Sequence, residues 1–379
     1  APSLSGDGHA FAFRNLDQAA NIDKSAFTDD DNYTLSFKRK LLSFNASHKL
    51  NAKLQFEMNG GYTAMRRYAQ DDSSLVDTAG NYDHTFYDDL YQGTVVTGDV
   101  QGTFKGKGIE IVAGTGLFDE TMTSENYYYS NAWGVYETLT NLDSLDIDVL
   151  TTNAFVHTQL EGKSICNKIR FLTIAAGARV SNHERFGNNF TFEINPTLRI
   201  AQNAMLYGTY ATGFNAPSLY QMYSPSVNSV SGIMRGNRYL KPETSKSTEF
   251  GIKYFPLENC AISAAYFYTV VDNSIEFVYL WNKETPVDSL TFFDYIGDTY
   301  LNLGKQTTQG MELSVDAAIS RHLSLTASIS VVGGKLEYNP SSIDTNKTKN
   351  NYVQLYNNGE YLTNKDVKVL GLARRPAMA

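Results

Sequence analysis

The feature that most constrains this chain is an apolar–polar alternation that recurs from about Tyr33 to Val331. In residues 190–200 every second position is apolar or proline, with Thr, Glu, Asn and Arg between them. Residues 323–331 repeat the pattern with Ser and Thr as the polar members. A period of two indicates β-strands with one apolar and one polar face. Because the polar positions are too hydrophilic for a packed interior, the pattern favours a transmembrane barrel with lipid outside and a wet or plugged lumen.

The connections between the predicted strands alternate between short and long. Short turns are expected near residues 47–49, 105–108, 161–163, 202–203, 257–259 and 320–322. Long loops are expected at residues 69–86, 118–143, 215–245, after 271, and at 338–364. Outer-membrane barrels show this asymmetry, with short periplasmic turns and long external loops. A soluble β-sandwich would not require such strict alternation, and the repeat expected of a propeller is absent from the sequence.

Composition agrees with this fold class and excludes others. The chain of 379 residues has a mean hydropathy of −0.32 and no apolar run of the roughly 18 residues that a membrane helix needs. Aromatic residues make up 13%, as expected for two interfacial girdles, although strands of any all-β protein also favour them. The net charge is −8 without a basic stripe, which argues against nucleic acid as a partner.

Motifs for enzyme chemistry are absent from the sequence. There is no zinc-protease helix motif, phosphate-binding loop, nucleophile elbow or Cys-x-x-Cys pair. Cys166 and Cys260 lie beside predicted turns, so we expect no disulfide framework. His157 on a strand is interpreted as a lumen-facing polar residue. The N-terminus lacks the basic and apolar regions of a signal peptide. We therefore expect a protein that is not an enzyme and requires no cofactor.

Three segments carry more information than periodicity. Residues 207–219 read Tyr-Gly-Thr-Tyr-Ala-Thr-Gly-Phe-Asn-Ala-Pro-Ser-Leu, and residues 236–245 read Gly-Asn-Arg-Tyr-Leu-Lys-Pro-Glu-Thr-Ser. Asn-Leu-Gly at 302–304 is followed by Gly-Met-Glu at 310–312. In this order and at this spacing, the segments resemble the β-barrel of TonB-dependent outer-membrane receptors.

Most of these motif residues are expected to shape loops rather than contact a ligand. Pro217 removes a backbone donor where a strand ends, and Pro242 holds the residue before it extended. The motif residues expected to be structural are Gly213, Phe214, Ala216, Pro217, Gly236, Asn237, Leu240, Pro242 and Glu243.

The resemblance implies a gated pore in the bacterial outer membrane that takes up a scarce metal-containing nutrient. The compact spacing is most similar to the vitamin B12 (cobalamin) branch, and the alternative within the family is an iron-siderophore or haem receptor. The family's implied partners are the TonB energy-coupling complex acting through a plug domain, outer-membrane lipid and a surface lipoprotein. The alternative from another class is a passive porin.

The chain departs from the family's full pattern of about 22 strands around a plug. Periodicity predicts about 12–14 antiparallel up-and-down strands, and no plug precedes them. Since open edges within lipid would leave backbone groups unpaired, we expect residues 1–379 to form an incomplete barrel, as an open and curved sheet belonging to a larger protein.

Two groups of side chains are candidates for binding. Aspartates crowd one predicted external loop, and the resemblance implies calcium there, whereas the alternative is a solvated acidic loop. The calcium candidates are Asp71, Asp72, Asp77 and Asp83. Aromatic residues of two other loops could stack on a large planar ligand, or could instead form a packing cluster or interfacial belt. The ligand candidates are Tyr127, Tyr128, Tyr129, Trp133, Tyr220 and Tyr223.

Overall fold

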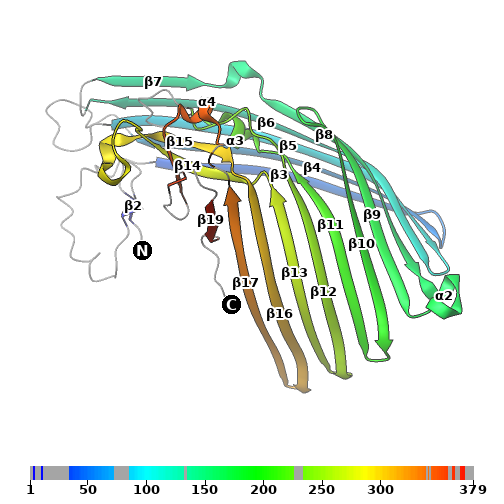
Figure 1. Ribbon diagram of the computed structural model, residues 1–379. Helices are drawn as coiled ribbons and strands as arrows, with labels where there is room; N and C mark the ends of the chain where they lie inside the picture. Colours follow the sequence, from blue (N-terminus) through cyan, green and yellow to red (C-terminus); the bar gives the residue numbers. More distant parts are fainter. Residues whose placement is uncertain are drawn as a thin grey trace.

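The computed structural model describes residues 3–4, 10–11, 34–71, 85–131, 135–225, 234–338, 340, 343–356, 361–362 and 368–371. Its main feature is one antiparallel sheet of 14 strands, which is open and strongly curved (Figure 1). This confirms the predicted fold class, strand number and open form. The strands are β3 (Thr34–Lys49), β4 (Leu54–Asp71), β5 (Thr85–Gly106), β6 (Ile109–Ser130), β7 (Tyr136–Asn141), β8 (Asp148–Glu161), β9 (Leu172–His183), β10 (Gly187–Ala201), β11 (Ala204–Asn215), β12 (Glu243–Leu257), β13 (Cys260–Asp272), β16 (Lys305–Ser320), β17 (Leu323–Tyr338) and β19 (Lys368–Gly371).

The order of the strands is a simple meander from β3 to β19, with β7 added beside the end of β6. Among the described residues, β3 has a strand neighbour on one side only, and β19 ends the sheet at the other edge. A separate pair, β1 (Ser3–Leu4) and β2 (Ala10–Phe11), forms a two-stranded sheet.

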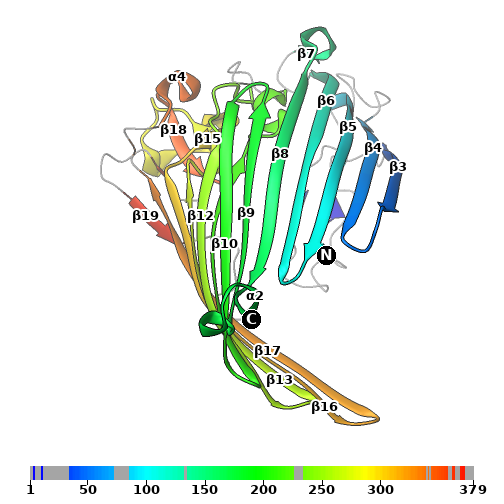
Figure 2. The same cartoon turned by 90° about the vertical axis from the view of Figure 1, so that its right-hand side faces the viewer.

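The two ends of the sheet differ in the way that the sequence predicts. Tight turns and one helical connection join the strands at one end, and the long connections lie at the other end (Figure 2). We call these the short-turn end and the long-loop end. The short-turn end carries α2 (Gly162–Ile165) and η3 (Asn167–Ile169). The long connections carry η2 (Asp143–Leu145), α3 (Leu219–Tyr223), η4 (Val287–Ser289), η5 (Phe292–Asp294) and α4 (Thr345–Thr348). None of the helices in the described residues is long and apolar enough to cross a bilayer.

Register aligns side chains of one character in rows across the wall of the sheet. Phe250 pairs with Tyr266, which pairs with Met311, and Met311 pairs with Val331. The side chains of this row are largely exposed and have no protein layer over them. The row one residue along contains Gly251, Ala265, Glu312 and Ser330, and belongs to the opposite face. The wall therefore separates an apolar face from a polar one, as the alternation predicts.

The polar face is the concave one. The long connections fold into the concave side of the sheet (Figure 1), where the ring of Tyr220 on α3 lies 6.2 Å from the ring of Tyr91 on β5. Asp99 and Gln101 share this face of β5 because they lie an even number of residues from Tyr91. Asn59 donates to the Asp99 carboxylate at 2.8 Å, and Gln101 donates to Glu57 at 2.7 Å. Such cross-strand polar contacts stabilise a face that is not packed by apolar groups.

Aromatic rings cover glycines on neighbouring strands of this concave face. A Cβ at Gly251 would lie 2.3 Å from the Tyr207 ring, and a Cβ at Gly310 would lie 2.7 Å from the Phe267 ring. Gly114 stands in the same relation to Phe155, also at 2.7 Å. The missing side chain of the glycine leaves the space that the ring fills, which buries part of the ring and protects the exposed strand backbone.

A smaller sheet of three strands was not predicted. It has the order β15 (Tyr295–Asn302), β14 (Ile275–Trp281), β18 (Tyr352–Leu355) and lies in segments that were expected to be loops. Its buried face forms the larger apolar core with the end of β17, and the core residues are Val278, Leu280, Leu301, Leu303, Leu336, Tyr338, Ile343, Val353, Leu355 and Leu362. These strands are short, β14 has rings on one face and Val278 and Leu280 on the other, and β15 has polar residues on both faces, so they lack the apolar–polar signal on which the prediction depended.

The predicted long loop at 118–143 is also corrected. Strand β6 continues to Ser130, and β7 pairs with its end from Tyr136 to Asn141. Both faces of this extension meet polar surroundings or loops, so the alternation fades although the strand continues. Inside the extension, Met122 packs with α3 in a second apolar cluster that includes Leu219 and Met222.

Candidate functional site

The small sheet presents an aromatic face on the side opposite its aliphatic core. Alternate residues of β14 supply three rings to this face, and β15 and the end of β18 supply the others. The Phe277 ring centre lies 5.0 Å from that of Tyr300, and Tyr279 lies 5.1 Å from Tyr356. We call this set the aromatic face, and it consists of Phe277, Tyr279, Trp281, Tyr295, Tyr300 and Tyr356.

A bidentate ion pair lies at the centre of the aromatic face. The Arg235 guanidinium meets the Asp298 carboxylate at 2.6 Å and 3.0 Å, and the side chains are 21% and 10% exposed. The Tyr295 hydroxyl donates to the same carboxylate at 3.0 Å, and the guanidinium lies 5.8 Å from the Phe277 ring centre. The two parallel hydrogen bonds fix the position of Arg235 relative to Asp298. Both charges have lost much of their hydration, so each depends on the other as its partner.

The family-motif residues attach the small sheet to the wall. The Asn237 amide donates to the Tyr300 carbonyl at 2.8 Å, so a side chain covers the outer edge of β15. Asn302, at the end of β15, binds the neighbouring loop in return: its amide oxygen accepts from the Lys241 N–H, and its amide nitrogen donates to the Lys241 carbonyl. Glu243 accepts the Ile275 N–H at 2.7 Å. These contacts satisfy backbone groups that a missing neighbouring strand would otherwise leave unpaired.

The other motif residues also act through the backbone or through burial. A Cβ on Gly236 would lie 2.6 Å from the Ser224 nitrogen, so only glycine fits there without a backbone shift. Pro217 is buried and precedes α3, whose first turn is closed by reciprocal hydrogen bonds between Ser218 and Gln221. Leu240 is buried, Gly213 faces Ser245, Phe214 pairs with Thr244, Ala216 is half-buried, and Pro242 accepts from Asn273.

The ligand candidates of the sequence analysis do not form one group. Tyr220 lies beside the aromatic face, since Arg235 donates to its hydroxyl at 3.4 Å. Tyr223 lies between two other arginines: Arg185 donates to its hydroxyl at 2.6 Å, and Arg238 lies over its ring at 5.0 Å. The two tyrosines thus anchor α3 on different sides.

The tyrosines of β6 belong to the wall instead. The Tyr127 hydroxyl donates to Glu137 on β7, and its ring packs on Phe86. Tyr128 contacts the Tyr136 ring at 6.1 Å, and Tyr129 pairs with Glu137 in the strand register. Trp133 lies outside the described residues.

The calcium prediction rests mainly on residues outside the described ranges, where Asp72, Asp77 and Asp83 lie. Asp71 is described and is fully buried at the end of β4. In the described part of the chain, no group of three or more His, Cys, Asp or Glu residues is placed to hold a metal ion. Calcium binding therefore stays a prediction.

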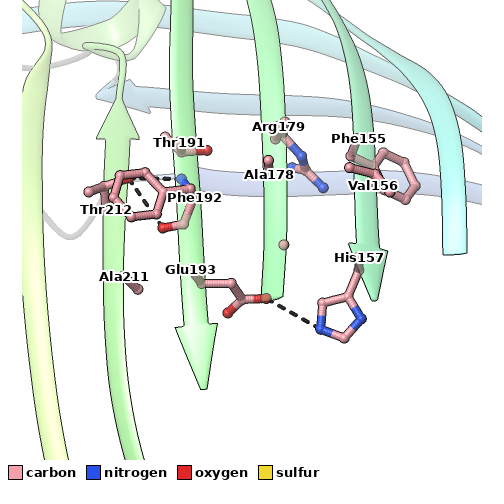
Figure 3. Close-up of a pocket in the computed structure, with 11 residues that line it drawn as sticks. Phe155, Val156, His157, Ala178, Arg179, Thr191, Phe192, Glu193, Ala211 and Thr212 are labelled. Carbon is pink, nitrogen blue, oxygen red and sulfur yellow. Dashed lines mark hydrogen bonds and ion pairs between the residues drawn. The ribbon is translucent and has the colours of Figure 1, made fainter. Parts of the chain in front are cut away.

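A cavity of about 250 Å³ lies against the wall where β8 to β11 are adjacent (Figure 3). His157 faces Glu193 across Gly177, with 3.7 Å between the His Nε2 and the carboxylate. The Arg179 guanidinium lies 5.3 Å from the Phe155 ring centre. His157, Arg179 and Glu193 belong to the concave face, as predicted for His157, and they can offer hydrogen bonds to a small polar group.

The aromatic face could not be found from the sequence analysis, because its segments were interpreted as loops. The available signal was the spacing Phe277, Tyr279, Trp281, in which three large rings stand at every second position. This period of two with aromatic members indicates a strand even without polar residues between them.

Comparisons with known proteins agree with this geometry. The family model "TonB dependent receptor-like, beta-barrel" matches residues 3–370. The vitamin B12 transporter BtuB of Vibrio vulnificus is 29% identical over 167 residues, which is 41% of this chain and 25% of the transporter. The probable TonB-dependent siderophore receptor PirA of Acinetobacter baumannii is 29% identical over 92 residues, covering 21% of this chain and 12% of the receptor.

Solved structures give the same fold at lower identity. The copper transporter OprC superposes with a TM-score of 0.58 at 13% identity, over 81% of this chain and 51% of that protein. The chain thus spans about half or less of the length of these three proteins. The relatives are receptors and transporters rather than enzymes. Because the family model covers nearly the whole chain, this protein belongs to the TonB-dependent receptor β-barrel family, which is located in the bacterial outer membrane.

Proposed function

We propose that this chain is the wall and ligand-facing part of a receptor that takes up a scarce metal-containing nutrient, with vitamin B12 as the favoured ligand. The observation that carries the proposal is the aromatic face, held by the Arg235–Asp298 pair on the concave side at the long-loop end. Long loops of outer-membrane barrels are external, so this face would meet a ligand arriving from outside.

The chemistry of the aromatic face suits a large ring system. Half-exposed phenol and indole rings offer both apolar contact area and hydroxyl groups, which a corrin ring with amide side chains could use. The similarity to a vitamin B12 transporter over 167 residues supports this choice. A ferric siderophore is the second candidate within the family, and the similarity to a siderophore receptor favours it.

Transport through this wall needs parts beyond the described strands. In the described part of the chain, the outer edge of β3 and the part of β17 beyond its pairing with β19 would leave backbone N–H and C=O groups unpaired in lipid, which is too costly in a bilayer. Further strands of the whole protein therefore close the barrel, a plug fills it, and the TonB complex supplies energy through that plug. A surface lipoprotein is a further proposed partner.

Uptake by a strain that carries the complete gene tests this function. A deletion strain should lose growth on limiting vitamin B12 and recover it with the gene, and a protonophore should abolish the recovered uptake. Recovery on a ferric siderophore alone would move the assignment to the second candidate. Uptake that persists without TonB would indicate a passive porin.

The aromatic face is tested by the double variant Phe277→Ala, Tyr279→Ala. Loss of two stacking rings should weaken ligand binding about ten-fold or more. Tyr266→Ala on the convex face is the matched control and should bind normally. Tyr127→Ala, measured in the same binding assay, shows whether the tyrosines of β6 contribute to ligand binding independently of the aromatic face. If the double variant binds ligand as well as the wild type does, the aromatic face is not part of the binding site.

Calcium is proposed to order the acidic connection that includes Asp71, Asp72, Asp77 and Asp83. Carboxylates at this density suit a hard cation that prefers oxygen ligands. Chelation by EGTA should then weaken ligand binding, and added Ca²⁺ should restore it. Unchanged binding after chelation would leave the solvated acidic loop as the correct interpretation.

A further inference from the structure

One connection at the short-turn end differs from its neighbours. Most adjacent hairpins turn in about two residues, as at 107–108, 202–203 and 321–322. Between β8 and β9, however, residues 162–171 form α2 and η3 and project from the end of the wall (Figure 1). Residues 163–171 are all exposed. A two-residue turn would be enough to join β8 and β9, so joining the strands does not explain the additional residues of this connection.

The exposed side chains of this connection are apolar and basic. Ile165 is 65% exposed, Phe171 48% and Ile169 38%. The sequence from 162 to 171 contains three basic residues and no acidic one, although the whole chain has a net charge of −8. Glu161, which precedes the connection, pairs with Lys163 at 3.0 Å. We call this surface the rim patch, and it consists of Lys163, Ile165, Lys168, Ile169, Arg170 and Phe171.

The rim patch stands on a fixed scaffold. A Cβ on Gly162 would lie 2.0 Å from the Ile169 carbonyl oxygen, so the connection closes tightly on itself. Ser164 fills the space over Gly108 in the adjacent turn, and the Phe171 carbonyl accepts the Arg199 N–H at 2.8 Å. Two neighbouring hairpins therefore hold the rim patch, which presents its apolar side chains without being able to bury them.

We propose that the rim patch binds anionic phospholipid headgroups at the periplasmic boundary of the outer membrane. Short turns of outer-membrane barrels lie on the periplasmic side. Exposed Ile and Phe beside Lys and Arg are the combination by which a surface segment dips its apolar groups below the headgroups and pairs its cations with phosphate. In the adjacent turn, exposed Lys107 adds a further cation, and Lys105 is paired with Glu110 at 3.4 Å.

The single exposed thiol of this connection allows a direct test. In a Cys260→Ser background, Cys166 is labelled with an environment-sensitive fluorophore, and the full-length receptor is placed in vesicles of phosphatidylcholine and phosphatidylglycerol. Either lipid is supplied with brominated acyl chains at equal mole fraction, because bromine quenches a fluorophore close to it. Quenching by brominated phosphatidylglycerol should exceed quenching by brominated phosphatidylcholine about two-fold or more, and high salt should reduce the difference.

Variants separate the two contributions. Lys163→Glu with Lys168→Glu should bring the ratio of the two quenching values to about one, since electrostatic attraction is lost. Ile165→Ser with Phe171→Ser should reduce quenching by both lipids together. A fluorophore at Gln202→Cys, in a chain with both native cysteines replaced by serine, is the control on a tight turn of the same end and should show no lipid preference.

Equal quenching by the two lipids at Cys166 would overturn the proposal. The same ratio at the control turn, or an unchanged ratio in the charge-reversal variant, would also overturn it. None of these measurements involves a nutrient ligand, so their outcome is distinguishable from failure of the uptake function.

Discussion

The 14-stranded wall and the three-stranded sheet are built from the same antiparallel pairing, yet they bury their side chains in opposite ways. On the wall, apolar residues such as Met311 and Phe250 remain mostly exposed on the convex face. In the small sheet, Val278, Leu280 and Val353 have no exposed surface at all. The difference reflects the surroundings of each sheet. The wall lacks a protein layer because lipid supplies its apolar surroundings, whereas the small sheet carries its own core as a water-soluble domain does.

The largest expected effect comes from the ion pair of the small sheet. Arg235→Met leaves the Asp298 carboxylate with a single hydroxyl donor in a largely buried position, which should lower the free energy of unfolding of this region by about 4 kcal/mol. Urea unfolding can be followed by Trp281 fluorescence in a Trp133→Phe background. The double variant Arg235→Met, Asp298→Leu should recover much of the loss, because no unpaired charge remains. A single variant as stable as the wild type would contradict this view of the pair.

The next effect compares equal truncations in the two regions. Leu280→Ala in the small sheet should cost about 3 kcal/mol, because a fully buried leucine leaves a cavity. The matched variant Leu323→Ala, at a position 55% exposed on the wall, should cost less than about 1 kcal/mol in detergent. Similar losses for both variants would show that the wall has a protein core that the structure does not describe.

A third variant pair tests the solvent of the wall. Ile329→Lys places a charge on the convex face and should reduce stability in bilayers by about 2 kcal/mol. Ser330→Lys places the same charge one residue along, on the concave face, and should have little effect. The two variants should become more alike in detergent, where headgroups and water reach the surface. Equal tolerance in bilayers would argue against lipid on the convex face.

The smallest effect is a dependence on pH at the long-loop end. The Lys347 amine donates to the carbonyls of Met234 and Gly236 at 2.7 Å and 2.6 Å, and burial lowers its pKa to about 8 from 10.5. Between these values the unfolded lysine binds the proton that the folded one has lost. The stability around α4 should therefore rise with pH from about 8 to 10.5, by at most about 1 kcal/mol per pH unit, and should not depend on this lysine below about pH 8.

Hydrogen exchange of residues 343–351, corrected for the intrinsic rate, measures this dependence. Lys347→Met should show no such rise, and amides of β10 on the wall serve as the internal control. Exchange protection that falls between pH 8 and 10.5 in the wild type would contradict the assigned direction.

The same contrast explains what the sequence could predict. The alternation in residues 190–200 and 323–331 predicts strands of the wall, because each strand meets lipid on one face and a polar lumen on the other. The small sheet meets a core on one face and aromatic neighbours on the other, so Val278 and Tyr279 give no apolar–polar contrast. The partners of Arg235 could not be inferred either, since Asp298 lies 63 residues away and only the folded loops bring the two together.

The motif residues were expected to shape loops, and in the structure they act through contacts with the backbone or through burial. What the motif could not reveal was the partner, because Asn237 binds the backbone of β15 and Asn302 belongs to β15, a strand that was itself unpredicted. Loop shape can thus be inferred from Pro and Gly chemistry, but an edge that a side chain covers becomes visible only with the tertiary structure.

The side chains of Asn237 and Asn302 attach the small sheet in a way that leaves its surface free to vary. Asn237 binds the backbone of β15 at Tyr300 and Asn302 binds the backbone of Lys241, so neither contact constrains which side chains stand on the aromatic face. Tyr279 or Trp281 can therefore be substituted without loss of these hydrogen bonds, so the shape of the aromatic face can change while the attachment of the small sheet stays intact.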